Sequence, residues 1–141
     1  MAPTASPRSA ASLSSAETSL VVAINTTRLT HGLAPLKVDV HLERAARSHS
    51  HDMLRRNYFA HGAFAQRMRR FHVHGPFVGE NLVWETGHLS ASAAVRDWLA
   101  SPEHRANMLR PGFRRIGVAA PWGRFAGARV ATVMTTDFAG R

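Results

Sequence analysis

Cysteine is absent from this 141-residue chain, and lysine occurs only once, at Lys37. Without cysteine, the chain has no disulfide framework, no thiolate metal site and no cysteine nucleophile. Because lysine is so scarce, arginine carries almost all of the positive charge. Long apolar runs are also missing. The longest, residues 20–24, is far shorter than the roughly 20 residues that a membrane-spanning helix needs, so no transmembrane segment is expected.

The chain is 45% hydrophobic, which is enough for one compact core. We expect residues 16–141 to form a single domain, and residues 1–15, rich in alanine, serine, threonine and proline, to be a flexible leader. The 18 Lys and Arg outnumber the 9 Asp and Glu, for a formal net charge of +9. Arginine binds carboxylate, phosphate and sulfate through paired hydrogen bonds, so polyanions are expected partners, with an ordinary solvated surface as the alternative.

Capping residues indicate where the first helices begin. Ser14-x-x-Glu17 matches a capping box, and His31-Gly32 supplies the stop. Asp39 is a good N-cap for a second helix. At helical spacing its apolar face contains Leu42, Ala45, Ala46, His49 and Met53. Because His49 falls inside this face, we expect a buried histidine that is hydrogen-bonded to the backbone rather than a metal ligand.

Three stretches have the character of strands: residues 77–84, 114–120 and 129–138. A turn region at Pro121-Trp122-Gly123, with a further glycine at Gly127, is expected to join the last two. Both faces of residues 129–138 are fairly apolar. This pattern predicts an α/β fold in which helices cover a central sheet on both sides.

Two further helix signals precede the last strands. Ser90 is expected to cap a helix over residues 91–100, with Trp98 on its apolar face as a structural core residue. Ser101 is the expected cap of the next short helix, and proline follows it at the first helical position, where its missing amide has no cost. This start places His104 on the first turn of a helix, which is a rigid mounting.

Two other residues stand out by their settings. His61 follows the aromatic pair Tyr58-Phe59, which would anchor a loop just before it. Glu80 falls in an otherwise apolar stretch, so its carboxylate needs a partner. The His72-x-His74 spacing resembles that of a metal-binding strand, but glycine and proline follow directly and favour a loop, so we expect only a weak site there.

A series of short motifs then resembles one family, the CAP superfamily of cysteine-rich secretory proteins, antigen 5 and pathogenesis-related proteins, in its compact bacterial SCP-like form. The resemblance runs from about residue 20 to residue 138. The motifs, in the order of the family, are Asn25-x-x-Arg28 with Gly32-Leu33-x-Pro35-Leu36, Ala46-x-x-His49-Ser50-x-Asp52-Met53, Tyr58-Phe59-x-His61, Gly79-Glu80-Asn81-Leu82, Trp98-x-x-Ser101-Pro102-x-His104-Arg105-x-Asn107-Met108-Leu109 and Phe113-x-x-Ile116-Gly117-Val118.

The resemblance implies a three-layer α/β/α sandwich with a central, mainly antiparallel sheet, and an extracellular location. It also implies a cleft of two histidines and two glutamates that can hold a divalent metal, usually zinc. By motif, the metal ligands correspond to His61 and His104, and the first glutamate to Glu80, as a residue behind the ligands or as a candidate base. The position of the second glutamate is Ser101, so a complete tetrad does not carry over. Asn81 is expected to have a structural role.

Three functions are compatible with these observations. The favoured one is a secreted binding module whose cleft or apolar groove takes a lipid, sterol or cell-envelope ligand. The second is a zinc-dependent hydrolase with Glu80 as base, and the third is an arginine-rich polyanion-binding or antimicrobial protein. Two histidines form a weaker zinc site than three, and a histidine–glutamate network that binds nothing is the alternative to metal binding.

Overall fold

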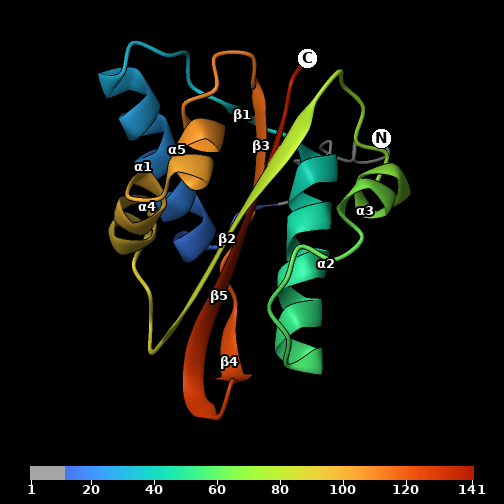
Figure 1. The fold of residues 1–141 in the computed structure, drawn as a ribbon, viewed down its shortest axis with the longest axis vertical. Coiled ribbons are helices and arrows are strands. Elements are labelled where there is room, and N and C mark those ends of the chain that lie inside the picture. The colour runs from blue at the N-terminus through green and yellow to red at the C-terminus, as the bar shows by residue number, and fades with distance from the viewer. Residues whose placement is uncertain (1–11) are drawn as a thin grey trace, which may run out of the picture.

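The computed structural model describes residues 12–141. Figure 1 shows a sheet between two helical layers, with α1 (Ser15–Thr30), α4 (Ala91–Leu99) and α5 (Pro102–Met108) on one side and α2 (Val40–Arg56) and α3 (Phe64–Arg70) on the other. The predicted α/β/α sandwich is therefore confirmed. Of the leader expected over residues 1–15, residues 1–11 lie outside the described part of the chain, whereas Ser14 and Ser15 already form the start of α1.

The sheet is built around β5 (Ala128–Ala139), which pairs antiparallel with β2 (Val78–Thr86), β3 (Arg115–Ala119) and β4 (Trp122–Phe125). The short β1 (Lys37–Val38) adds a parallel strand beside β3, and the strand order is β1-β3-β5-β2. The predicted, mainly antiparallel sheet is thus confirmed. β2 lies at the edge, and its register with β5 places Glu80 opposite Asp137.

The prediction of a turn at Pro121-Trp122-Gly123 is wrong, because Trp122 begins β4, which pairs with β5. The chain reverses at Ala126 and at Gly127, the further glycine of the expected connection, and their φ angles of 50° and 83° lie in the left-handed region. Glycine adopts this conformation without steric cost. The tight turn therefore forms at Gly127, and the aromatic residues before it are free to join the sheet.

The helices begin with the predicted capping residues. In α1 the Glu17 amide donates to Ser14 Oγ at 3.1 Å, and the Ser14 amide donates to Glu17 Oε1 at 2.8 Å, which completes the capping box. Asp39 caps α2 by accepting from two amides of its first turn. Ser101 occupies the N-cap of α5, but within the described chain its side chain makes no capping hydrogen bond. Proline at the first helical position therefore defines this start.

The two faces of the sheet pack differently. Toward α1, α4 and α5, a large apolar cluster contains Trp98, Phe113 and Phe138. Trp98 is 1% exposed, and its indole Nε1 donates to the Leu82 carbonyl at 2.9 Å, so its expected core role is confirmed. On the other face, a Cβ atom on Gly117 would overlap the backbone of α2. The glycine thus lets α2 pack directly onto β3.

Candidate functional site

Glu80 lies on the edge strand β2 and is 6% exposed, so its carboxylate depends on partners within the protein. His61 Nδ1 donates to Oε1 at 2.8 Å, and Arg67 Nη2 donates to Oε2 at 2.6 Å. Arg67 also donates to the His61 carbonyl at 3.0 Å, which ties α3 to the loop that carries His61. Both carboxylate oxygens are therefore engaged within the protein itself.

The charge of Glu80 reflects opposing effects. Burial alone would raise its pKa, but the neighbouring Asp137 carboxyl, the Arg67 guanidinium and the His61 imidazole together lower the pKa. Complete burial, with the Glu80 charge beside it, raises the pKa of Asp137 well above its usual range. Neither carboxyl oxygen of Asp137 has a hydrogen-bond partner of good geometry within residues 12–141. Within the pair, Glu80 therefore favours its charged form and Asp137 its neutral form.

His49 extends from α2 toward the same carboxylate. It is buried, and its Nε2 lies 2.8 Å from the Ala60 carbonyl and 4.0 Å from Glu80 Oε1. Burial is the main cause of the lowered pKa of His49, so the ring is neutral and Nε2 donates to Ala60. The expected buried histidine with a backbone hydrogen bond is confirmed, and it anchors the loop just before His61.

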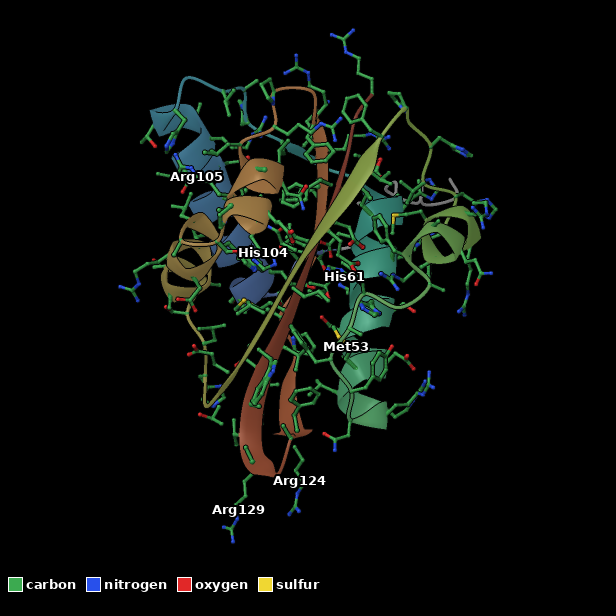
Figure 2. All side chains as sticks on the ribbon, in the orientation of Figure 1. Met53, His61, His104, Arg105, Arg124 and Arg129 are labelled. Carbon is green, nitrogen blue, oxygen red and sulfur yellow. The ribbon has the colours of Figure 1, made fainter. Side chains whose placement is uncertain are left out.

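His104 reaches the site from the other helical layer. It is half-buried on the first turn of α5, and both burial and the charge of His61 lower its pKa. Asn81 Nδ2 donates to the His104 carbonyl at 3.0 Å, and Asn107 Nδ2 donates to Asn81 Oδ1 at 3.0 Å and to the Glu80 carbonyl at 3.2 Å. These amides fasten α5 to β2. Figure 2 shows His61 and His104 on either side of this edge strand.

The candidate site residues from the sequence therefore converge in part. The edge strand brings together His61, Glu80 and His104, and the His61 side chain is 55% exposed. Within residues 12–141, no three His, Asp or Glu side chains are grouped so that they could hold a metal ion by themselves. His72 and His74 lie exposed in the loop between α3 and β2. Ser101, at the position of the second glutamate, is partly buried at the start of α5.

Two contributors to the site were missed from the sequence. Asp137 had a detectable signal, because it is the one acidic residue of β5 and is followed directly by the apolar Phe138 and Ala139. Arg67 had none, since it is one of several arginines in a short helix. Only the path of the loop before α3 brings it to Glu80.

A separate concavity of about 850 Å³ lies between α1 and α4. Most of its lining is small or apolar, including Val22, Ala23, Val95, Leu99 and Met134. Val22 is 57% exposed there. Exposed apolar grooves of this size are typical of ligand or partner sites.

Known proteins share this sequence pattern. Residues 21–121 match the family model described as the cysteine-rich secretory protein family, CAP. The uncharacterised protein YkwD of Bacillus subtilis is 36% identical over 112 residues, which are 76% of this chain and 43% of YkwD. The uncharacterised membrane protein YlbC of the same organism is 35% identical over 99 residues, 67% of this chain and 28% of YlbC. The chain thus spans less than half the length of these relatives.

Solved structures share the fold. An extracellular protein with a SCP domain from Bacillus anthracis has a TM-score of 0.74 at 29% identity, over 89% of this chain and 40% of that one. For an outer surface protein of Borrelia burgdorferi the TM-score is 0.63 at 18% identity, over 86% and 90%, a likeness of fold alone. None of the helices described in residues 12–141 is long and apolar enough to cross a membrane. Because the family model matches most of a chain with this fold, the chain belongs to the cysteine-rich secretory protein (CAP) family.

Proposed function

We propose that this domain is an extracellular binding module whose cleft holds a divalent cation, zinc in the first place, between His61 and His104. The hydrogen bond between His61 Nδ1 and Glu80 carries this proposal. A carboxylate can only accept, so Nδ1 holds the proton and Nε2 keeps its lone pair for a metal. Histidines that bind zinc are commonly oriented by a carboxylate in this way. The extracellular and outer surface proteins among the similar structures support the location.

His104 would supply the second nitrogen. Burial is the main cause of the lowered pKa of His104, so its ring is neutral near pH 7, which is the form that binds metal. With two protein ligands, water would complete the coordination, whereas structural zinc sites use four protein ligands. We therefore expect weak and reversible binding.

The state of Glu80 favours binding over hydrolysis. Its two oxygens are engaged by His61 and Arg67, and its pKa is lowered. A carboxylate whose oxygens are already engaged and whose pKa is lowered is a poor general base for activating water near neutral pH. We therefore place Glu80 behind the metal ligands, where it orients His61.

Calorimetric titration of zinc tests the proposal. We expect binding heat from the unmodified protein and its loss in the His61→Ala/His104→Ala variant. His51→Ala/His88→Ala is the matched control, because it also removes two histidines, both exposed and outside the cleft. Equal heats from all three proteins, or no heat from the unmodified protein, would overturn the proposal.

The groove between α1 and α4 supports a second role, binding the acyl chain of an envelope lipid. Its apolar lining and its open length along two helices fit such a chain, whereas a polar ligand would leave most of the lining unused.

Displacement of a fluorescent fatty acid measures this second role. Val22→Arg places a charge in the groove and is expected to lower the affinity at least about tenfold, because burying an unpaired charge is costly. Leu29→Arg is the matched control, since Leu29 is an equally exposed residue of α1 outside the groove lining. If the two variants bind alike, the groove is not the site.

A further inference from the structure

Four arginines gather around a concavity next to the histidine–glutamate site, with which it shares His49 and Arg67. A pocket of about 820 Å³ lies between α2 and α3, and Arg55, Arg56, Arg67 and Arg70 are part of its lining. Figure 1 shows the two helices side by side on the same face of the sheet. His61, Glu80 and His104 are not among the lining residues.

Helical spacing explains how the lining forms. On α2 the lining residues are at positions 48, 49, 51, 52, 55 and 56, and on α3 at positions 66, 67 and 70, with the N-cap residue 63 just before them. Positions three and four apart fall on one side of a helix. One face of α2 and one face of α3 therefore border the same pocket.

The pocket is rich in positive charge. Asp52 is its one lining carboxylate, and it already accepts from Arg55 at 2.8 Å, from Arg56 at 3.2 Å and from the Tyr58 hydroxyl at 2.6 Å. The Tyr58 hydrogen bond is the main cause of the lowered pKa of Asp52, so this carboxylate stays ionised and paired.

The four arginines thus outnumber the carboxylates available to them. Arg67 is paired with Glu80 at 2.6 Å. Arg70 makes no salt bridge within the described residues, and its guanidinium lies over the Phe71 ring at 5.4 Å. Positive charge therefore remains for a ligand.

Hydrogen-bond donors dominate the rest of the polar lining. Ser48 contributes a hydroxyl and Gln66 an amide to the same pocket. Guanidinium groups bind the oxygens of phosphate in pairs, and the effect is strongest in a concave setting that concentrates positive charge.

We infer that the pocket between α2 and α3 binds a phosphate-bearing ligand, held by the guanidinium groups of Arg56 and Arg70. The phosphate could belong to a small soluble ester or to a lipid headgroup. The pocket is larger than one phosphate ion, so an attached organic group fits. This inference does not depend on the zinc or acyl-chain proposals.

Two binding assays distinguish the two sources of phosphate. Calorimetry measures the binding of glycerol 3-phosphate. Co-sedimentation measures the binding of phosphatidylglycerol vesicles, with phosphatidylcholine vesicles as the reference. We expect Arg56→Gln/Arg70→Gln to weaken binding at least about tenfold, because each lost charge-assisted hydrogen bond accounts for such a factor. Arg124→Gln/Arg129→Gln removes the same charge at the β4–β5 hairpin, where Figure 2 labels both residues, and should leave binding unchanged. Arg70→Lys keeps the charge but not the forked guanidinium. Its affinity should lie between those of the unmodified protein and the Arg56→Gln/Arg70→Gln variant.

Each outcome bears on the inference. Loss of glycerol 3-phosphate binding in the pocket variant alone supports a soluble ligand, and loss of vesicle binding alone supports a lipid headgroup. Equal weakening by the pocket and hairpin variants would show attraction to overall charge and overturn the inference. The inference is also overturned if the unmodified protein binds neither glycerol 3-phosphate nor phosphatidylglycerol vesicles.

Discussion

The two helical layers support the sheet in different ways. On the side of α1, α4 and α5, the sheet packs against a large apolar cluster around Trp98 and Phe113. On the side of α2 and α3, it buries the carboxyl groups of Glu43, Glu80 and Asp137. Apolar burial stabilises a fold without regard to protonation, whereas buried carboxyl groups link stability to pH. The layer of α1, α4 and α5 thus contributes stability that does not depend on pH, whereas the layer of α2 and α3 contains the titratable groups beside the cleft.

In the apolar layer, the largest loss of stability is expected from truncating Trp98. Trp98→Ala should lower the free energy of unfolding by about 3–5 kcal/mol, because it leaves a cavity and an unpaired Leu82 carbonyl. Urea denaturation at two pH values measures the loss, which should be the same at both. Trp122→Ala, at a tryptophan that is 61% exposed, is the control, and an equally large loss there would contradict the assignment of the core.

The polar layer should respond to pH through Glu43. This side chain is fully buried, its Oε1 accepts from the Val118 amide at 2.6 Å, and burial raises its pKa from 4.5 to about 7. The folded state therefore holds a proton that the unfolded state releases above pH 4.5. Glu43 should lower the stability as pH rises from about 4.5 to 7, by up to about 3 kcal/mol.

Glu43→Gln isolates this effect, because glutamine keeps an oxygen for the Val118 amide and does not titrate. Denaturant titrations from pH 4 to 8 should show that the free energy of unfolding of the variant increases relative to that of the unmodified protein as pH rises. Glu103→Gln, at an exposed acidic residue of α5, should leave the pH profile unchanged. Parallel profiles for the unmodified protein and Glu43→Gln would contradict a raised pKa.

A smaller effect, on zinc affinity, is expected from substituting Glu80 on β2, where the two layers meet. Glu80→Gln removes the negative charge that orients His61 and pairs with Arg67. Zinc affinity should fall about 10- to 100-fold, as is common when the partner of a metal-binding histidine is lost. Calorimetry provides the affinity, and circular dichroism shows whether the fold is kept. Unchanged affinity in a folded variant would mean that Glu80 does not prepare His61.

The sequence predicted most of the scaffold because its signals are local. The capping box at Ser14, the N-cap at Asp39 and the proline at the start of α5 each depend on a few neighbouring residues. The turn after β3 was misplaced because proline and glycine occur at Pro121 and Gly123 as well as at Gly127, and only pairing with β5 decides between them.

Residues whose partners are distant in sequence were harder to interpret. Arg28 is fully buried and donates to the carbonyls of Ala34, Met108, Arg110 and Phe113, contacts that helical spacing alone does not reveal. Arg67 and Asp137 reach Glu80 in the same way, through the chain path before α3 and the register of β2 with β5. The motifs identified His61, Glu80 and His104, whereas the network around them required the tertiary structure.

The central claim is that His61 and His104, approaching β2 from opposite layers, form one metal site. Long-range proton–nitrogen NMR spectra of the histidine rings during zinc titration test it most directly. Nε2 of His61 and a ring nitrogen of His104 should shift together with the same zinc dependence, while buried His49, bonded to Ala60, should not shift. Zinc-dependent shifts at His72 or His74, with His61 and His104 unchanged, would contradict the account.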